Sequence, residues 1–136
     1  MNLLDEGSVA IVEETDIVTV RQTVREAAGQ IGLGVTDVTR VVTAASELAR
    51  NVFKYGNGGS MTWKLLESEF AKGIELTFQD KGPGIPDIEQ ALQDGFSTGG
   101  GLGMGLPGAK KLMDEMSVDS SPQIGTRVVV RKWRSI

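Results

Sequence analysis

FQDKGPGIPDIEQALQDGFSTGGGLGMGLPGAKK, residues 78–111, holds nine of the eighteen glycines of this 136-residue chain. Glycine weakens regular structure, so this crowding indicates backbone that approaches a ligand closely or moves between conformations. The apolar alternation of Ile74, Leu76 and Phe78 precedes the stretch and predicts a strand, and a helix-like run follows it. We interpret the stretch as a nucleotide-binding segment.

The first part of this segment is Asp80-Lys81-Gly82-Pro83-Gly84, which comes directly after the predicted strand. An ionised aspartate only accepts hydrogen bonds. Facing a purine, Asp80 would accept from the exocyclic amine of adenine and repel the carbonyl oxygen of guanine. Gly82 and Gly84 would leave room for the flat base. An ordinary Asp-Gly-Pro-Gly turn is the alternative interpretation.

The second part is Gly101-Leu102-Gly103-Met104-Gly105-Leu106-Pro107-Gly108. Pro107 suits the first turn of a helix, which we expect over residues 107–116. The free amides at that helix start, with glycines beside them, would seat a phosphate, whereas a flexible surface loop with two solvated lysines is the alternative. The fingerprint GxGxxG at 103–108 lacks the preceding strand and the later acidic residue of a dinucleotide site, so we reject that interpretation.

A long helix, capped by Thr36 or Asp37 and running to about Tyr55, carries a continuous apolar stripe. The stripe is made of Val38, Val41, Val42, Ala45, Leu48, Ala49, Val52 and Phe53. Glu47 and Asn51 lie one turn apart on the other side, together with Lys54. A solvated face explains these residues simply. The pair also suits an ATP-like ligand, which needs an oxygen ligand for magnesium and a base beside its terminal phosphate.

The remaining pattern predicts helices mixed with hairpin-connected strands. We expect a strand at 8–12, a helix capped by Thr15 or Asp16 that runs to residue 31, a hairpin of strands 61–65 and 74–79, a short helix at 88–93, a lid-like loop at 94–104, and strands at 117–121 and 126–133. This order predicts an α+β fold, a two-layer α/β sandwich with helices on one face of a mixed, mostly antiparallel sheet.

Composition limits the classes of function. With 40% hydrophobic and 24% charged residues, we expect residues 1–136 to form a single globular domain. The absence of cysteine and histidine excludes disulfides, zinc sites and thiol or imidazole catalysis, so any metal must be a hard ion such as Mg²⁺.

Charge and hydropathy restrict location and partners. The net charge of -4 and pI of about 4.8 argue against a general nucleic-acid binder. No apolar run is long enough for a membrane helix and the N-terminus has no signal-peptide pattern, so we expect a cytoplasmic protein without a membrane partner. We interpret the basic cluster of Arg127, Arg131, Lys132 and Arg134 as solvated charges at a strand end.

The order of these signals resembles the GHKL ATPase and kinase superfamily, whose α/β sandwich is also called the Bergerat fold. Glu47–Asn51 is similar to its N-box, Asp80-x-Gly82-x-Gly84 to its first glycine box, Gly101–Leu106 to its second, and Gly125-Thr126 to its third. Within the superfamily, SELARN, DKGPGIPDI, DGFSTGGGLGMGLPG and KKLMDE resemble the RsbT-type serine/threonine protein kinases of bacterial stress signalling. The resemblance covers about residues 8–134.

The resemblance implies roles for particular residues. Asp80 would bind the adenine amine, and Thr126 would support that carboxylate or a bridging water. Asn51 would ligate Mg²⁺ between the phosphates, and Glu47 would act as general base or orient the attacking hydroxyl. The other residues implied in binding ATP are Gly82, Gly84, Ile85, Gly101, Leu102, Gly103, Met104, Gly105 and Leu106.

The resemblance also implies partners. The substrates would be serine or threonine residues of STAS-domain scaffold and antagonist proteins in a stressosome-like complex, and the released kinase would activate a downstream phosphatase. Two alternatives stay open: a non-catalytic, ATP-gated binding module like an anti-sigma regulator, and a metabolic enzyme acting on a small molecule. The eukaryotic kinase signatures VAIK, HRD and DFG are absent, which excludes ordinary protein-kinase architecture.

Overall fold

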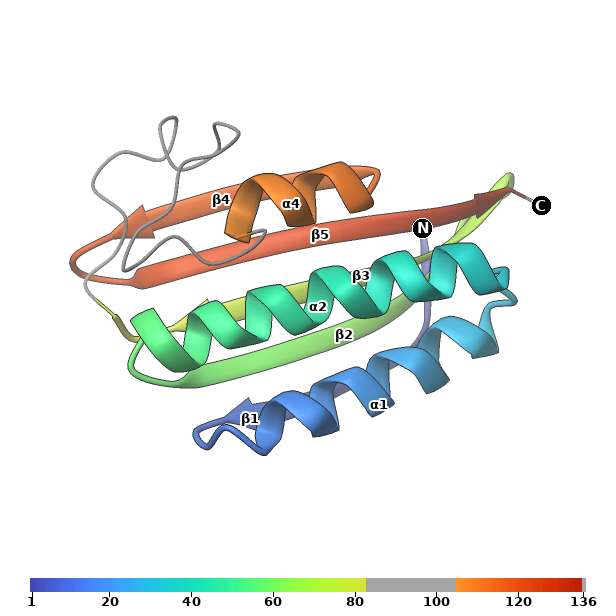
Figure 1. Cartoon of the computed structure of the whole chain (residues 1–136). Helices are drawn as coiled ribbons and strands as arrows, with labels where there is room; N and C mark the ends of the chain where they lie inside the picture. The colour runs from blue at the N-terminus through green and yellow to red at the C-terminus, as the bar shows by residue number, and fades with distance from the viewer. Residues whose placement is uncertain (83–104, 136) are drawn as a thin grey trace.

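The computed structural model describes residues 1–82 and 105–135. Figure 1 shows how the helices and strands follow one another along the chain. Their bounds are β1 (Asn2–Ile11), α1 (Asp16–Gln30), α2 (Val35–Tyr55), β2 (Gly59–Glu67), β3 (Ala71–Asp80), α4 (Gly105–Leu112), β4 (Glu115–Ser121) and β5 (Gly125–Ser135). The predicted short helix at 88–93 and the predicted loop at 94–104 fall outside the described residues.

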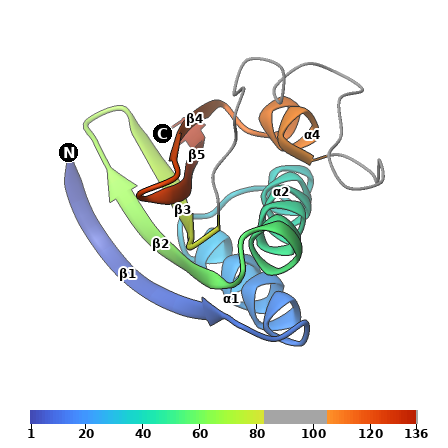
Figure 2. The same cartoon turned by 90° about the vertical axis from the view of Figure 1, so that its left-hand side faces the viewer.

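The strands form one sheet in the order β1-β2-β3-β5-β4, and each pairing within the described residues is antiparallel. Figure 2 shows α1, α2 and α4 together on one side of this curved sheet. The predicted α+β sandwich with helices on one face is therefore confirmed, and the described pairings include no parallel pair. None of the described helices combines the length and the apolar character that crossing a membrane requires.

The core lies between the helix layer and the sheet. Fully buried members include Val20 and Val24 of α1, Val41 and Leu48 of α2, and Met61, Leu65, Leu76, Phe78 and Val130 of the sheet. The burial of such a side chain contributes about 1.5–3 kcal/mol relative to exposure. The apolar stripe predicted for α2 faces this core, with Val38 and Phe53 partly buried at its margin.

The helix starts differ from the predicted caps. No side chain caps α1, and Asp16 instead accepts hydrogen bonds from the amides of Val12 and Glu13, both at 2.9 Å, so it stabilises the turn before the helix. Helix α2 begins after Gly34 without a side-chain cap. Asp37, which we expected to cap it, forms an ion pair with Arg40 at 3.1 Å instead.

Several strand boundaries were predicted too narrowly. β1 begins at Asn2 rather than at residue 8, because its exposed first half pairs with β2 as far as the Asn2–Glu67 register, across an irregularity between Leu3 and Asp5. The side chains of this half carry no alternation of buried and exposed positions that would predict a strand.

Helix α4 ends at Leu112 rather than at residue 116. The next residues join the sheet instead, since Glu115 pairs in register with Arg131 and β4 begins there. Tertiary pairing with β5 thus overrides the helical pattern of this short segment.

The interpretation of the basic cluster as solvated charges was wrong for two of its residues. Lys132 is buried, and its Nζ lies 3.3 Å from Asp114, 3.7 Å from Asp37 and 3.4 Å from the carbonyl oxygen of Leu112. Arg131 donates to Glu75 at 2.7 Å. Lys132 therefore ties the last residue of α4 and the first turn of α2 to the sheet.

Candidate nucleotide-binding site

The Asp80 carboxylate lies at the end of β3, on the side covered by helices, because it continues the alternation of buried Leu76 and Phe78. Its Oδ1 accepts hydrogen bonds from the amides of Gly82 and Thr126, both at 2.9 Å. Among the described residues, Oδ2 has no hydrogen-bond partner. One oxygen thus fixes the orientation of the carboxylate, and the other remains available to accept from a ligand.

Oδ2 is not completely buried. In the described part of the chain, no fully buried side-chain nitrogen or oxygen lacks a hydrogen-bond partner. Asp80 as a residue is half-buried. An acceptor that is partly desolvated and already oriented by backbone amides discriminates sharply between a donor and another acceptor.

Three glycines surround this carboxylate because backbone approaches it closely on three sides. A Cβ at Gly56 would overlap the Asp80 side chain, and a Cβ at Gly82 would lie 2.8 Å from the Cα of Gly56. Gly125 has a φ of +77°, and a Cβ there would lie 2.9 Å from Asp80 Oδ1. The end of α2, the end of β3 and the turn before β5 therefore meet at Asp80.

Two further residues hold these three segments together. The Gln79 side-chain amide donates to the carbonyl oxygens of Asp80 and Ile124, both at 2.9 Å. The Lys81 amide donates to the carbonyl oxygens of Gly56 at 3.1 Å and Gly58 at 3.3 Å. Sequence reasoning missed both roles, since a glutamine in a strand and a backbone amide in a turn carry no local signal of their distant partners.

Thr126 contributes through its backbone as well as its side chain. Its amide orients Asp80, whereas its hydroxyl lies 3.1 Å from the hydroxyl of Ser120. Thr126 is 9% exposed. The structure thus brings Asp80, Gly82 and Thr126 together, as the glycine boxes predicted.

Glu47 and Asn51 lie one turn apart on α2, and both are half-buried, whereas Lys54 is exposed. Glu47 and Asn51 therefore do not lie on a fully solvated face of the helix. The same helix runs on to Gly56, which contacts the Asp80 corner, so α2 links these two side chains to the carboxylate.

Helix α4 begins at Gly105, and Pro107 occupies its first turn as expected. Leu106 is buried and joins the core, so its side chain packs inward. The other predicted contacts, Gly84, Ile85, Gly101, Leu102, Gly103 and Met104, lie outside the described residues.

The donor set suits a hard cation that takes most of its ligands from a substrate. The described residues contain no group of three acidic side chains that could hold a metal ion by themselves. The side-chain oxygen of Asn51 is a ligand of the kind that Mg²⁺ accepts alongside phosphate oxygens and water.

Comparison with known proteins identifies the family to which this chain is related. A family described as "Histidine kinase-like ATPase domain" matches residues 12–132. The serine/threonine-protein kinase RsbT of Bacillus subtilis is 46% identical over 129 residues, which cover 95% of this chain and 97% of that protein. The anti-sigma F factor of Bacillus licheniformis is 33% identical over 120 residues, covering 85% and 82%.

Solved structures show the same fold at low sequence identity. The RsbU and RsbW domains of a Mycobacterium tuberculosis protein match 96% of this chain and 33% of that longer chain, with a TM-score of 0.63 and 17% identity. The mycobacterial sensor histidine kinase MprB matches 97% of this chain and 100% of that chain, with a TM-score of 0.55 and 18% identity. The chain therefore belongs to the histidine kinase-like ATPase family, among the RsbT-type members of the GHKL superfamily.

Proposed function

We propose that this chain is an ATP-dependent serine/threonine protein kinase. The observation that carries the proposal is the 46% identity, over 95% of the chain, to a protein named as such a kinase. The geometry at Asp80 supports the nucleotide half of the proposal.

At the adenine end, Asp80 Oδ2 would accept a hydrogen bond from the exocyclic amine. The amides of Gly82 and Thr126 hold the other oxygen, so Asp80 need not reorganise when the base binds. Preorganised acceptors of this kind bind a donor without a further ordering cost. Gly82, Gly84, Ile85 and Thr126 would form the walls beside the base.

At the phosphate end, Asn51 would hold Mg²⁺ together with the phosphates, and the backbone of residues 101–106 would donate to phosphate oxygens. The bound cation would supply neutralisation of phosphate charge. Glu47 would accept the proton of the attacking hydroxyl on its carboxylate, or orient that hydroxyl. In phosphoryl transfer a protein contributes mainly by positioning the reacting groups and by stabilising their charge.

The acceptor would be a serine or threonine of another protein, as the resemblance to RsbT-type kinases implies. The chain contains no histidine that could be phosphorylated as in a histidine kinase. We propose STAS-domain scaffold and antagonist proteins as substrates, and a downstream phosphatase as the protein that the released kinase activates. These assignments rest on the resemblance to RsbT-type kinases. We place this activity in the cytoplasm.

The test is transfer of labelled phosphate from Mg-ATP to candidate STAS-domain proteins. Glu47→Gln removes the proton acceptor and should lower the transfer rate about 10²–10⁴-fold while ATP still binds. Glu26→Gln, an exposed glutamate on α1, is the matched control and should transfer normally. Normal transfer by the Glu47 variant would contradict its proposed role.

A second candidate is an ATP-gated binding module, favoured by the 33% identity to an anti-sigma F factor. In that case ATP would change the affinity for a partner protein without phosphorylating it. The same assay separates the candidates: nucleotide-dependent partner binding with no labelled product from the wild-type protein would favour the binding module.

A further inference from the structure

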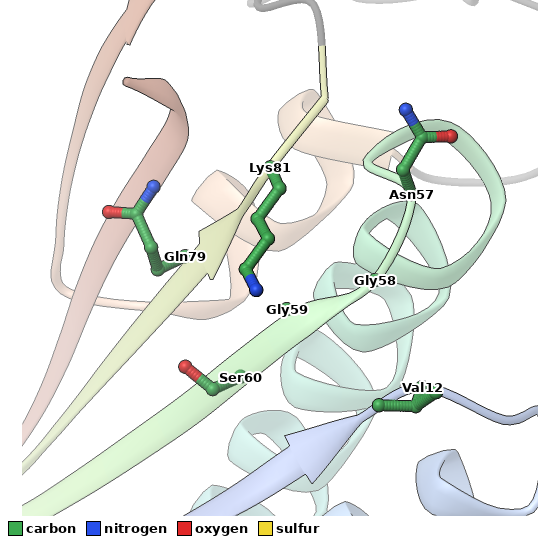
Figure 3. Close-up of a pocket in the computed structure, with 7 residues that line it drawn as sticks. All are labelled: Val12, Asn57, Gly58, Gly59, Ser60, Gln79 and Lys81. Atoms are coloured by element: carbon green, nitrogen blue, oxygen red, sulfur yellow. The ribbon is translucent and has the colours of Figure 1, made fainter. Parts of the chain in front are cut away.

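A pocket lies at the same end of the sheet as Asp80, and the proposed function does not use it. Its volume is about 470 Å³. It is lined by Val12, Asn57, Gly58, Gly59, Ser60, Gln79 and Lys81 (Figure 3). These residues come from the ends of β1, β2 and β3 and from the turn after α2.

The pocket opens on the side of the sheet that no described helix covers. Ser60 and Gln79 alternate with Met61 and Phe78, which are buried under the helices, so their side chains leave on the other side. Lys81 follows Asp80 and points away from it, with its ammonium group toward Gly59 and Ser60 (Figure 3). The pocket and the Asp80 corner therefore lie on opposite faces of one strand end.

The residues that line this pocket carry a positive charge, whereas the chain as a whole has a net negative charge. The pocket is lined by one lysine and by no carboxylate, although the chain has 18 acidic and 14 basic residues. Lys81 has no ion-pair partner among residues 1–82 and 105–135. The ammonium of Lys81 and the hydroxyl of Ser60 are both able to donate hydrogen bonds here, whereas the side-chain amide of Asn57 points away from them (Figure 3).

We propose that this pocket binds a carboxylate, supplied by an acidic segment of a protein partner. A carboxylate carries one negative charge and two oxygens, which matches one ammonium and one neighbouring hydroxyl. A phosphate dianion carries more negative charge than this single ammonium balances. Val12 is 68% exposed at the rim and offers apolar contact for the methylene groups of a glutamate.

The pocket is tied to the nucleotide corner through the backbone. The Lys81 amide donates to Gly56 and Gly58, and the Gly56 backbone lies against the Asp80 side chain. A partner bound at Lys81 would therefore contact the segment that shapes the Asp80 corner. The proposal itself concerns binding and does not depend on kinase activity.

The experiment is a titration of the full-length, nitrogen-15-labelled protein, followed by NMR of the backbone amides. The probes are a blocked tetraglutamate peptide, the matching tetraglutamine peptide and inorganic phosphate. The amide signals of Gly59, Ser60 and Lys81 should shift and saturate with tetraglutamate and not with tetraglutamine. Higher salt should weaken the binding, because the ammonium is exposed to solvent.

Variants test the assignment to Lys81. Lys81→Gln keeps the backbone hydrogen bonds and should weaken tetraglutamate binding about threefold to tenfold, and Ser60→Ala should weaken it about twofold to fivefold. Lys64→Gln removes the same charge from β2 outside the pocket and should leave binding unchanged. The NMR spectrum of each variant reports directly whether it is folded.

Three results would overturn the proposal. The first is equal binding of the glutamate and glutamine peptides. The second is wild-type affinity for tetraglutamate in Lys81→Gln. The third is saturation of the same amides by inorganic phosphate without any response to tetraglutamate, which would assign the pocket to free phosphate.

Discussion

Asp80 and Lys81 are consecutive in the chain and lie on opposite faces of the sheet. On the helix-covered face, Asp80 is enclosed by three backbone segments and one of its oxygens accepts two amides. On the uncovered face, Lys81 extends into an open pocket and its side chain has no ion-pair partner among the described residues.

The two side chains differ in how firmly the surrounding protein fixes them before a ligand binds. The Asp80 corner depends on fixed geometry, so small changes in shape should alter both folding and ligand selection. The Lys81 pocket depends on charge in a solvated setting, where single interactions contribute little. The predictions below test whether the two faces differ in this way.

The largest effect is expected at Gly125. Replacing it with alanine puts a Cβ against Asp80 at a backbone angle that alanine rarely adopts, so Gly125→Ala should lower the free energy of unfolding by about 2–3 kcal/mol. Urea denaturation measures this. Gly34→Ala is the control, because a Cβ there meets nothing within 4 Å. A Gly125 variant as stable as the control variant would mean that the corner is not tightly packed.

An intermediate effect is expected at Lys132, the buried lysine of the helix-covered face. Lys132→Met removes contacts to Asp114, Asp37 and the Leu112 carbonyl, and should lower the free energy of unfolding by about 1–2 kcal/mol. Lys64→Met on the uncovered face should stay within about 0.5 kcal/mol of wild type. Equal losses for the two lysines in thermal or urea unfolding would contradict the contrast between the faces.

The smallest effect is expected at Asp16, an exposed carboxylate that, like Asp80, accepts two backbone amides on one oxygen. The amides of Glu13 and Val12 hold the pKa of Asp16 below its ordinary value of 3.8. A lowered pKa stabilises the fold above the ordinary value, and this contribution is lost as pH falls through the pKa of the folded state.

The melting temperatures of wild type and Asp16→Asn measured from pH 7 to pH 2 check this sign. The wild-type protein should be slightly more stable at pH 7, and the difference should shrink below about pH 4. A difference that stays constant over this range would mean that the charge of Asp16 does not contribute to stability.

Much of the fold follows from local pattern. The apolar stripe of α2 and the alternation before Asp80 predicted a helix and a strand that the structure confirms, because these segments bury one continuous face. The first half of β1 and the end of α4 did not follow, because pairing with β2 and β5 decides them and their own residues are polar or ambiguous.

In the candidate site, too, adjacent residues allowed predictions and contacts with distant residues did not. The position of Asp80 at a strand end, with Gly82 beside it, was predicted from adjacent residues. The second amide on its carboxylate comes from Thr126, 46 residues away, and only the boxes of a known family pointed there. The roles of Gln79 and Lys132 were not predicted, since each depends on partners far along the chain.

The account rests most of all on Asp80 Oδ2 as the acceptor that recognises adenine. Calorimetry with ATP and with purine riboside triphosphate, which lacks the 6-amino group, tests this directly. Wild type should bind ATP about tenfold to hundredfold more tightly, the range expected for a hydrogen bond to a charged group, and Asp80→Asn should lose this preference. Equal affinity of the wild-type protein for the two nucleotides would contradict the account.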